Sequence, residues 1–193
     1  MKPESYLLAQ ARNNAWANHR LLEACAALPQ GELEAPRTGF FPSLLATLNH
    51  ILIVDWYYVD ALEGGGLGQG AFLDEVPCKT MANLQREQAA VDGRLIALCA
   101  GLDDTALDKA VRLVRREGER IERADRVLLH LFEHQIHHRG QVHAMLSGTS
   151  AAPPQLDEFF LDQDAGVRRE DLAALGWREE DLWQDWPAPK TEP

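Results

Sequence analysis

The sequence predicts an all-α protein, a four-helix bundle with a small β-hairpin before the last long helix. Four segments of about twenty or more residues carry apolar side chains at helical spacing, and glycine or proline residues interrupt the chain between them. One shorter stretch, residues 110–123, alternates apolar and polar residues as a pair of strands does. Four long helices joined by loops typically pack as a bundle.

The first two helices are bounded by proline and glycine. The first is expected over residues 5–28, where Pro29 stops it. The second is expected over residues 43–63, because Pro42 has no backbone N–H and suits a position at the start of a helix. The glycines of residues 64–70 end this helix, and we expect a flexible loop there.

The third and fourth helices flank the predicted hairpin. The third is expected over residues 80–101, with Thr80 as N-cap because its hydroxyl can accept a free backbone N–H. The strands of residues 110–123 are expected to turn at Glu117-Gly118. The fourth helix then follows over residues 125–147.

The length of 193 residues predicts one domain with a tail. We place the bundle at residues 1–165 and a C-terminal extension at residues 166–193. A short helix is expected within residues 172–183, and the proline-rich end at residues 186–189 is expected to fray.

Charge and hydropathy exclude two classes of partner. Nineteen Lys and Arg against thirty Asp and Glu give a net charge of −11, which is unfavourable for binding a nucleic-acid backbone. The arginine-rich stretch of residues 112–126 is interleaved with acids and is expected to be a solvated surface. The longest apolar stretch, near Ile51, is interrupted at Asp55, so no membrane-spanning helix is expected.

The three cysteines, Cys25, Cys78 and Cys99, show no close pairing, which favours a reducing, cytoplasmic location. Cys25 and Cys99 lie in apolar helical stretches and are expected in the core. Cys78 follows Pro77 in an expected loop, where an exposed thiol is conceivable, although nothing nearby clearly lowers its pKa.

Histidines are the informative residues of the chain, because five of the seven fall in the last long helix. The seven are His19, His50, His130, His134, His137, His138 and His143. At about 100° per residue, His134 and His138 lie one turn apart on one face, the spacing with which two imidazoles can bind one metal ion. On spacing alone, His130 could replace His138 in this pair.

A third ligand should come from another helix. His50 lies on an apolar stripe of the second helix and is expected to point inward, so that it completes an open three-histidine site. His50 alone is also typical of a hydrogen-bonded core histidine, and the His134/His138 pair alone is compatible with a solvated face. Gln141 shares the face of His134 and can orient a ligand or a water molecule. Tyr57 is the candidate pocket wall or proton donor.

Three strings of the chain resemble the DinB family of the DinB/YfiT-like superfamily, over residues 6–161. They are Asn14-Ala15-Trp16-Ala17-Asn18, Thr47-Leu48-Asn49-His50-Ile51 and the run from His130 to Gln141 with its His-x-x-x-His-Arg-Gly-Gln pattern. The resemblance implies a four-helix bundle that binds a divalent metal, usually zinc or nickel, through His50, His134 and His138. It also implies a hairpin between the last two helices and, in many members, a homodimer.

The function that this resemblance implies is a metal-dependent thiol transferase or hydrolase acting on a small-molecule substrate. A low-molecular-weight thiol is then a candidate cofactor, since relatives in the superfamily use such thiols. The alternative is a non-catalytic metal-binding domain of a stress response. A metal exposed to solvent on one side suits the first hypothesis, because an open coordination position can bind water, thiol or substrate.

Glu133 departs from the family, which usually has asparagine before the first ligand of the last helix. This glutamate also completes a His-x-x-Glu-His string, His130 to His134, which is typical of inverted zincin peptidases. Because Glu133 lies about 100° from the face of His134, we expect it on the surface. A ferritin-like di-iron site is disfavoured, because no histidine has glutamate three residues before it.

Overall fold

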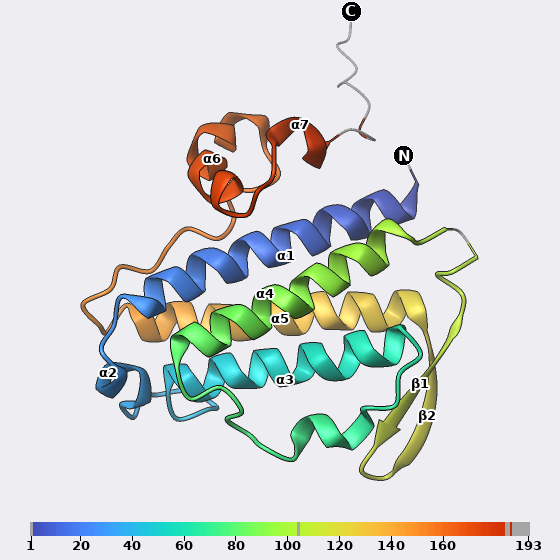
Figure 1. The fold of residues 1–193 in the computed structure, drawn as a ribbon, viewed down its shortest axis with the longest axis horizontal. Helices are drawn as coiled ribbons and strands as arrows, with labels where there is room; N and C mark the ends of the chain where they lie inside the picture. Colours follow the sequence, from blue (N-terminus) through green and yellow to red (C-terminus); the bar gives the residue numbers. More distant parts are fainter. Residues whose placement is uncertain (1, 104, 184–185, 187–193) are drawn as a thin grey trace, which may run out of the picture.

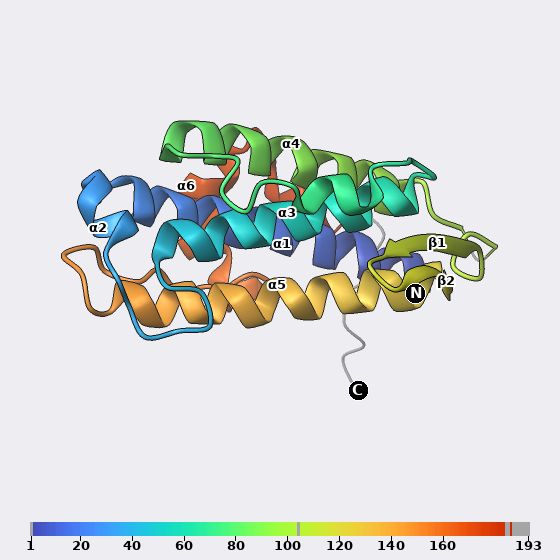
Figure 2. The ribbon, with the colours of Figure 1, turned by 90° about the horizontal axis from the view of Figure 1, so that it is seen from below.

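Four long α-helices form the body of the molecule in the computed structural model, which describes residues 2–103, 105–183 and 186. They are α1 (Pro3–Ala26), α3 (Leu44–Leu62), α4 (Met81–Ala100) and α5 (Ala124–Leu146). Helices α1 and α3 each pack against both α4 and α5, so the four close a ring around a shared core (Figures 1 and 2). The predicted four-helix bundle is confirmed, and each predicted helix end lies within two residues of the observed one.

Helices α3 and α4 run in the same direction, so the chain between them must return along the bundle (Figure 1). This return contains a short 3-10 helix, η1 (Gly68–Phe72), which packs against α3 and the hairpin. The expectation of a flexible loop over residues 64–70 was therefore wrong in part. The carboxylate of Asp60 accepts the backbone N–H of Leu67 at 2.7 Å, and Ala71 is buried, so side chains fix the segment in place.

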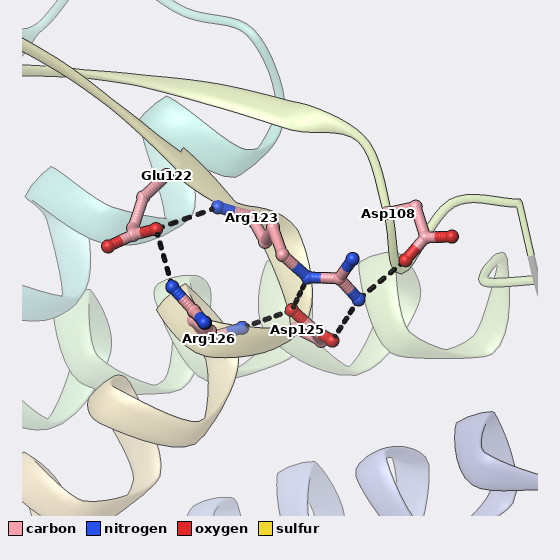
Figure 3. Close-up of polar contacts among 5 residues, drawn as sticks. All are labelled: Asp108, Glu122, Arg123, Asp125 and Arg126. Atoms are coloured by element: carbon pink, nitrogen blue, oxygen red, sulfur yellow. Dashed lines mark hydrogen bonds and ion pairs between the residues drawn. The ribbon is translucent and has the colours of Figure 1, made fainter.

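The predicted hairpin is present as β1 (Ala110–Arg115) and β2 (Gly118–Arg123), paired antiparallel. Its register places Arg115 opposite Gly118, whose φ of 115° favours glycine at the turn. Figure 3 shows how the end of β2 is joined to the start of α5: the Arg123 guanidinium lies between the carboxylates of Asp108 and Asp125. Asp125 also suits the first turn of α5, where the helix dipole favours negative charge.

Two further helices lie outside α1, on the side away from α3 (Figure 1). They are α6 (Ala165–Ala174) and α7 (Glu179–Leu182), preceded by the 3-10 helix η2 (Asp162–Asp164); a last short helix, α2 (Gln30–Glu34), follows α1. A second apolar cluster joins this extension to α1, formed by Trp16, Ala17, Phe159, Leu172 and Leu182. The indole N–H of Trp16 donates to the Asp171 carboxylate at 3.2 Å.

The sequence predicted one short helix at residues 172–183, where the structure has the end of α6 followed by α7 (Glu179–Leu182). Helix α6 starts earlier and ends at Ala174, because the chain reverses at Gly176, which has a φ of 71°. The domain boundary at residue 165 stays a prediction, and the expected fraying over residues 186–189 falls almost entirely outside the described residues. None of the described helices is both long and apolar enough to cross a membrane.

Candidate metal centre

Three histidines from two helices converge between α3 and α5. His50 comes from α3, and His134 and His138 come from α5. Their candidate ligand atoms all lie within 4.8 Å of one another, and the Nε2 atoms of His50 and His134 are 3.0 Å apart. The ring of His138 completes the group, with its centroid 4.6 Å from that of His50 and 4.4 Å from that of His134. The structure thus brings together the three residues predicted from the sequence.

The position of His50 depends on its neighbour Asn49, whose side chain is fully buried. Its amide nitrogen donates to the carbonyl of Cys78 at 2.9 Å, and its oxygen accepts the N–H of Cys78 at 2.8 Å. A single side chain thereby attaches the end of the returning loop to α3 beside the metal ligand. Nothing in our sequence analysis assigned a role to this asparagine, although a polar residue in an apolar helix is the signal that could have revealed it.

This clamp also corrects the expectation for Cys78. The residue is 3% exposed, so the loop does not present its thiol to solvent. Burial raises the pKa of the Cys78 thiol, as it does for Cys25 and Cys99, whose pKa values rise to about 12. All three cysteines are therefore neutral thiols at pH 7, and none is placed to act as a nucleophile.

A buried polar layer fixes the rotation of α5 beneath the histidines. Seven polar side chains from the four long helices form it: Asn14, Asn18, Asp55, Gln88, Asp92, Gln135 and Arg139. Gln135 and Arg139 directly follow the two ligands of α5 in sequence. Gln135 donates to Asp55, while Arg139 donates to Asn14, Asn18 and Gln135. Because Asp55 lies on α3 and the two asparagines lie on α1, these contacts with two other helices hold His134 and His138 toward His50.

The three imidazoles are neutral at physiological pH. Desolvation, together with the neighbouring His138, lowers the pKa of His50 to about 4. Desolvation and the nearby histidines lower the pKa of His134 to about 3, and burial also lowers that of His138. Neutral imidazoles carry the lone pairs that metal ions need.

Gln141 fixes which nitrogen of His138 is available. Its side-chain nitrogen donates to Nε2 of His137 at 3.1 Å, so its oxygen faces Nδ1 of His138, 2.9 Å away, and accepts that N–H. The proton of His138 therefore sits on Nδ1, and Nε2 keeps its lone pair for the cluster. The glutamine lies where the helical face predicted it.

The cluster fits a divalent metal ion that prefers nitrogen ligands. Two imidazole nitrogens bound to tetrahedral zinc lie roughly 3.3 Å apart, close to the 3.0 Å between the Nε2 atoms of His50 and His134. At most one proton can lie between two facing nitrogens. Three neutral imidazoles that face one another therefore have lone pairs without an N–H group to accept from. A cation satisfies them, and the absence of a carboxylate from the described cluster favours zinc or nickel over calcium or magnesium.

The comparison with protein families agrees with this arrangement. The sequence matches the model of the DinB family over residues 3–172. The chain belongs to the DinB family. The match covers the whole bundle and reaches into α6, beyond the residues 6–161 that the three strings suggested. A comparison with curated proteins gives no match.

A cavity of about 280 Å³ adjoins His50 of this DinB protein. Its wall includes Phe41, His50, Ile53, Phe72 and Glu75, so it is mainly apolar with one carboxylate. The ring of Phe41 stacks 4.2 Å from that of His50 and 5.7 Å from that of His138. The sequence placed Phe41 only at the end of a loop, and its position over the cluster emerges from the packing.

Tyr57 lies behind this cavity. Its ring is 5.3 Å from that of Phe72, and its hydroxyl donates to the carbonyl of Val114 at 3.1 Å. The hydroxyl proton is thus engaged by the hairpin, so Tyr57 supports the wall through Phe72. Its proposed role as a proton donor stays a prediction.

The remaining histidines lie outside the cluster. His130 is exposed, with its ring 6.5 Å from that of His134, so the ligand group found among the described residues contains His138 and not His130. His143 contacts the carbonyl of Pro154. Glu133 is exposed, as expected, and of the His-x-x-Glu-His string only His134 belongs to the group of candidate ligands found among the described residues.

Proposed function

We propose that this DinB protein binds one zinc or nickel ion through His50, His134 and His138 and acts as a metal-dependent thiol transferase or hydrolase on a small molecule. The observation that carries the proposal is the convergence of three neutral imidazoles within 4.8 Å, beside a cavity of about 280 Å³. Three protein ligands leave a coordination position open, which is typical of catalytic sites.

A divalent ion at this position supplies a nucleophile near neutral pH, because it lowers the pKa of a coordinated water or thiol. The chain's own residues prepare the site. Gln141 holds the proton of His138 on Nδ1, while the ring of Phe41 covers the imidazoles of His50 and His138. Glu75 is the carboxylate on the cavity wall and is the candidate acceptor for a proton released there.

Further parts of the proposal concern partners and location. The size of the cavity suits a small-molecule substrate and a low-molecular-weight thiol, and the net charge of −11 disfavours nucleic acid. Three buried cysteines without a disulfide support a cytoplasmic location. A homodimer rests on the family resemblance alone.

Metal content tests the site. We expect elemental mass spectrometry on untagged protein to find about one metal ion per chain, and His50→Ala and His138→Ala to lose it. His19→Ala on α1 and His130→Ala on α5 are matched controls that should keep it. Retention of the metal in His50→Ala would overturn the three-histidine site. Loss of the metal in His130→Ala would mean that His130 is one of the ligands.

A second measurement separates an enzyme from the non-catalytic alternative. In cobalt-substituted protein, a small thiol that reaches an open coordination position changes the visible absorption spectrum. We expect such a change at millimolar thiol. A spectrum that stays constant with every thiol and carboxylate tested, together with a metal that resists chelators, favours a closed, structural site.

A further inference from the structure

A second cavity lies where the hairpin meets α3 and α5. Its volume is about 340 Å³. The polar side chains that line it are Tyr58, Arg115, Arg120, Glu122, Arg126 and His130. Three arginines and one glutamate around one cavity give this part of an acidic protein a local positive charge.

Two of these arginines have no carboxylate partner in the part of the chain that the structure describes. Nη2 of Arg115 donates to the hydroxyl of Tyr58 at 2.6 Å, and Nη1 of Arg120 donates to a backbone carbonyl at 2.9 Å. Glu122 instead pairs with Arg126, at 3.5 Å (Figure 3). The cavity therefore contains two guanidinium groups whose charge is not balanced by an adjacent acid.

Neighbouring residues of the hairpin show the contrast. Arg112 pairs with Glu119 at 2.8 Å, and Arg123 lies between two carboxylates, those of Asp108 and Asp125 (Figure 3). Neither of these paired arginines lines the cavity. The cavity thus contains Arg115 and Arg120, whereas the arginines of the hairpin that pair with nearby carboxylates, Arg112 and Arg123, lie outside it.

The arginine cavity and the histidine cluster are connected through α5. Arg126, His130, His134 and His138 follow one another at intervals of four residues, so they form a continuous stripe along the helix. Helix α3 runs antiparallel to α5 and places Tyr58 opposite His130, with 5.3 Å between the ring centroids. His130 thus separates the arginine cavity from the metal ligand His134.

We propose that this arginine cavity binds an oxyanion, a carboxylate or a phosphate, that belongs to the small-molecule substrate of the metal centre. A guanidinium presents parallel N–H donors that match both groups, and the three arginines are exposed, so a ligand can reach them. One turn of α5 covers about 5.4 Å. The reacting group of the substrate is then separated from its anionic group by several bonds. This inference rests on the proposed function and specifies its substrate class.

Anion binding to the metal-free protein tests the inference without any assay of activity. We would titrate inorganic phosphate and succinate into wild-type protein, Arg120→Gln and Arg115→Gln by calorimetry at low salt. Arg116→Gln is the matched control, because Arg116 is exposed at the hairpin turn and does not line the cavity, yet its loss changes the net charge equally. We expect each cavity variant to weaken binding of the preferred anion by about tenfold and the control by less than about twofold.

A variant with the opposite sign sharpens the test. Glu122→Gln removes the acid of the cavity and frees Arg126, so binding should tighten. The comparison of phosphate with succinate identifies the group that the cavity prefers. Equal weakening in Arg120→Gln and Arg116→Gln, or no measurable binding of either anion to wild-type protein, overturns the inference.

Failure of this inference and failure of the metal site can be told apart by His50→Ala. If the oxyanion site is real, this variant keeps arginine-dependent anion binding even when it has lost the metal. If wild-type protein holds one metal per chain but shows no arginine-dependent anion binding, the proposed function stands and the inferred substrate class is wrong.

Discussion

The side-chain oxygen of Gln141 lies 2.9 Å from Nδ1 of His138, so one candidate ligand of the cluster is held in place by a residue one turn further along α5. The same glutamine contacts His137, which fixes the orientation of its amide. An imidazole held in this way presents a single tautomer and does not have to reorganise when a metal binds. His134 differs, because its Nδ1 is buried without a hydrogen-bond partner.

Replacing Gln141 should therefore weaken metal binding without removing a ligand. We expect Gln141→Leu to lower zinc affinity by about 10- to 100-fold, as is usual when the partner of a metal-binding histidine is lost. Gln141→Glu keeps an oxygen acceptor and should retain most of the affinity. Competition with a chromophoric chelator measures both. Equal affinities in wild type and Gln141→Leu would show that the contact has no role in binding.

Asn49→Ala should destabilise the fold rather than the metal site alone. The substitution leaves the N–H and the carbonyl of Cys78 buried without their partner, at a cost of about 2–3 kcal/mol. We expect urea unfolding to show this loss in metal-free protein as well. Thr80→Ala is a useful comparison, because it removes the N-cap of α4 at an exposed position and should cost only about 1 kcal/mol. A loss in Asn49→Ala no larger than this would contradict the clamp.

The helices of the bundle could be predicted because their signals are local. Hydrophobic periodicity, the proline before α3 and the glycines after it act within a few residues, so the predicted ends agree with the structure to within two residues. The His134/His138 pair is local in the same sense. The prediction that His50 joins this pair required the further assumption that the apolar stripe of its helix faces α5. The observed cluster supports that assumption.

The rest of the site depends on long-range contacts that no local pattern contains. Cys78 looked accessible beside Pro77 because the partner that buries its backbone, Asn49, lies 29 residues earlier. Residues 64–70 looked flexible because the contacts of η1 with α3 and β1 are tertiary. The start of α6 at Ala165 was missed for a similar reason, because this helix is stabilised by packing against Trp16.

The contact between α1 and α6 gives a further prediction. Trp16 is fully buried in the same apolar cluster as Leu172, so the two side chains share one interface. We expect Leu172→Ala to cost about 2–4 kcal/mol of unfolding free energy in wild-type protein. In a Trp16→Ala background the same change should cost less, by about 1 kcal/mol or more, because the interface is already open. Urea unfolding of the four proteins measures this, and strict additivity would mean that the extension does not dock on α1.

The last prediction concerns the buried layer and pH. Burial and the nearby Asp92 raise the pKa of Asp55 from 3.8 to about 8, although hydrogen bonds from Gln88 and Gln135 and the charge of Arg139 partly oppose this. A carboxyl whose pKa is raised by folding binds its proton more tightly in the native state. Its contribution to stability is therefore complete below pH 3.8 and is lost as the pH rises toward 8.

Between pH 7.5 and 9, His50 and His134 are neutral in the folded state, where their pKa values are about 4 and 3, and largely neutral in the unfolded state, where histidine titrates near 6.5, so this range reports mainly on Asp55. Wild-type, metal-free protein should lose up to about 1.4 kcal/mol of unfolding free energy per pH unit in the lower part of it. Asp55→Asn should remove that slope, because asparagine imitates the protonated carboxyl: its oxygen accepts from Gln88 and Gln135, and its nitrogen replaces the Oδ1 atom that has no partner. Asp157→Asn, at an exposed position, should leave the slope unchanged. Parallel curves for wild type and Asp55→Asn would mean that Asp55 is already ionised in the native layer, with Arg139 compensating both aspartates.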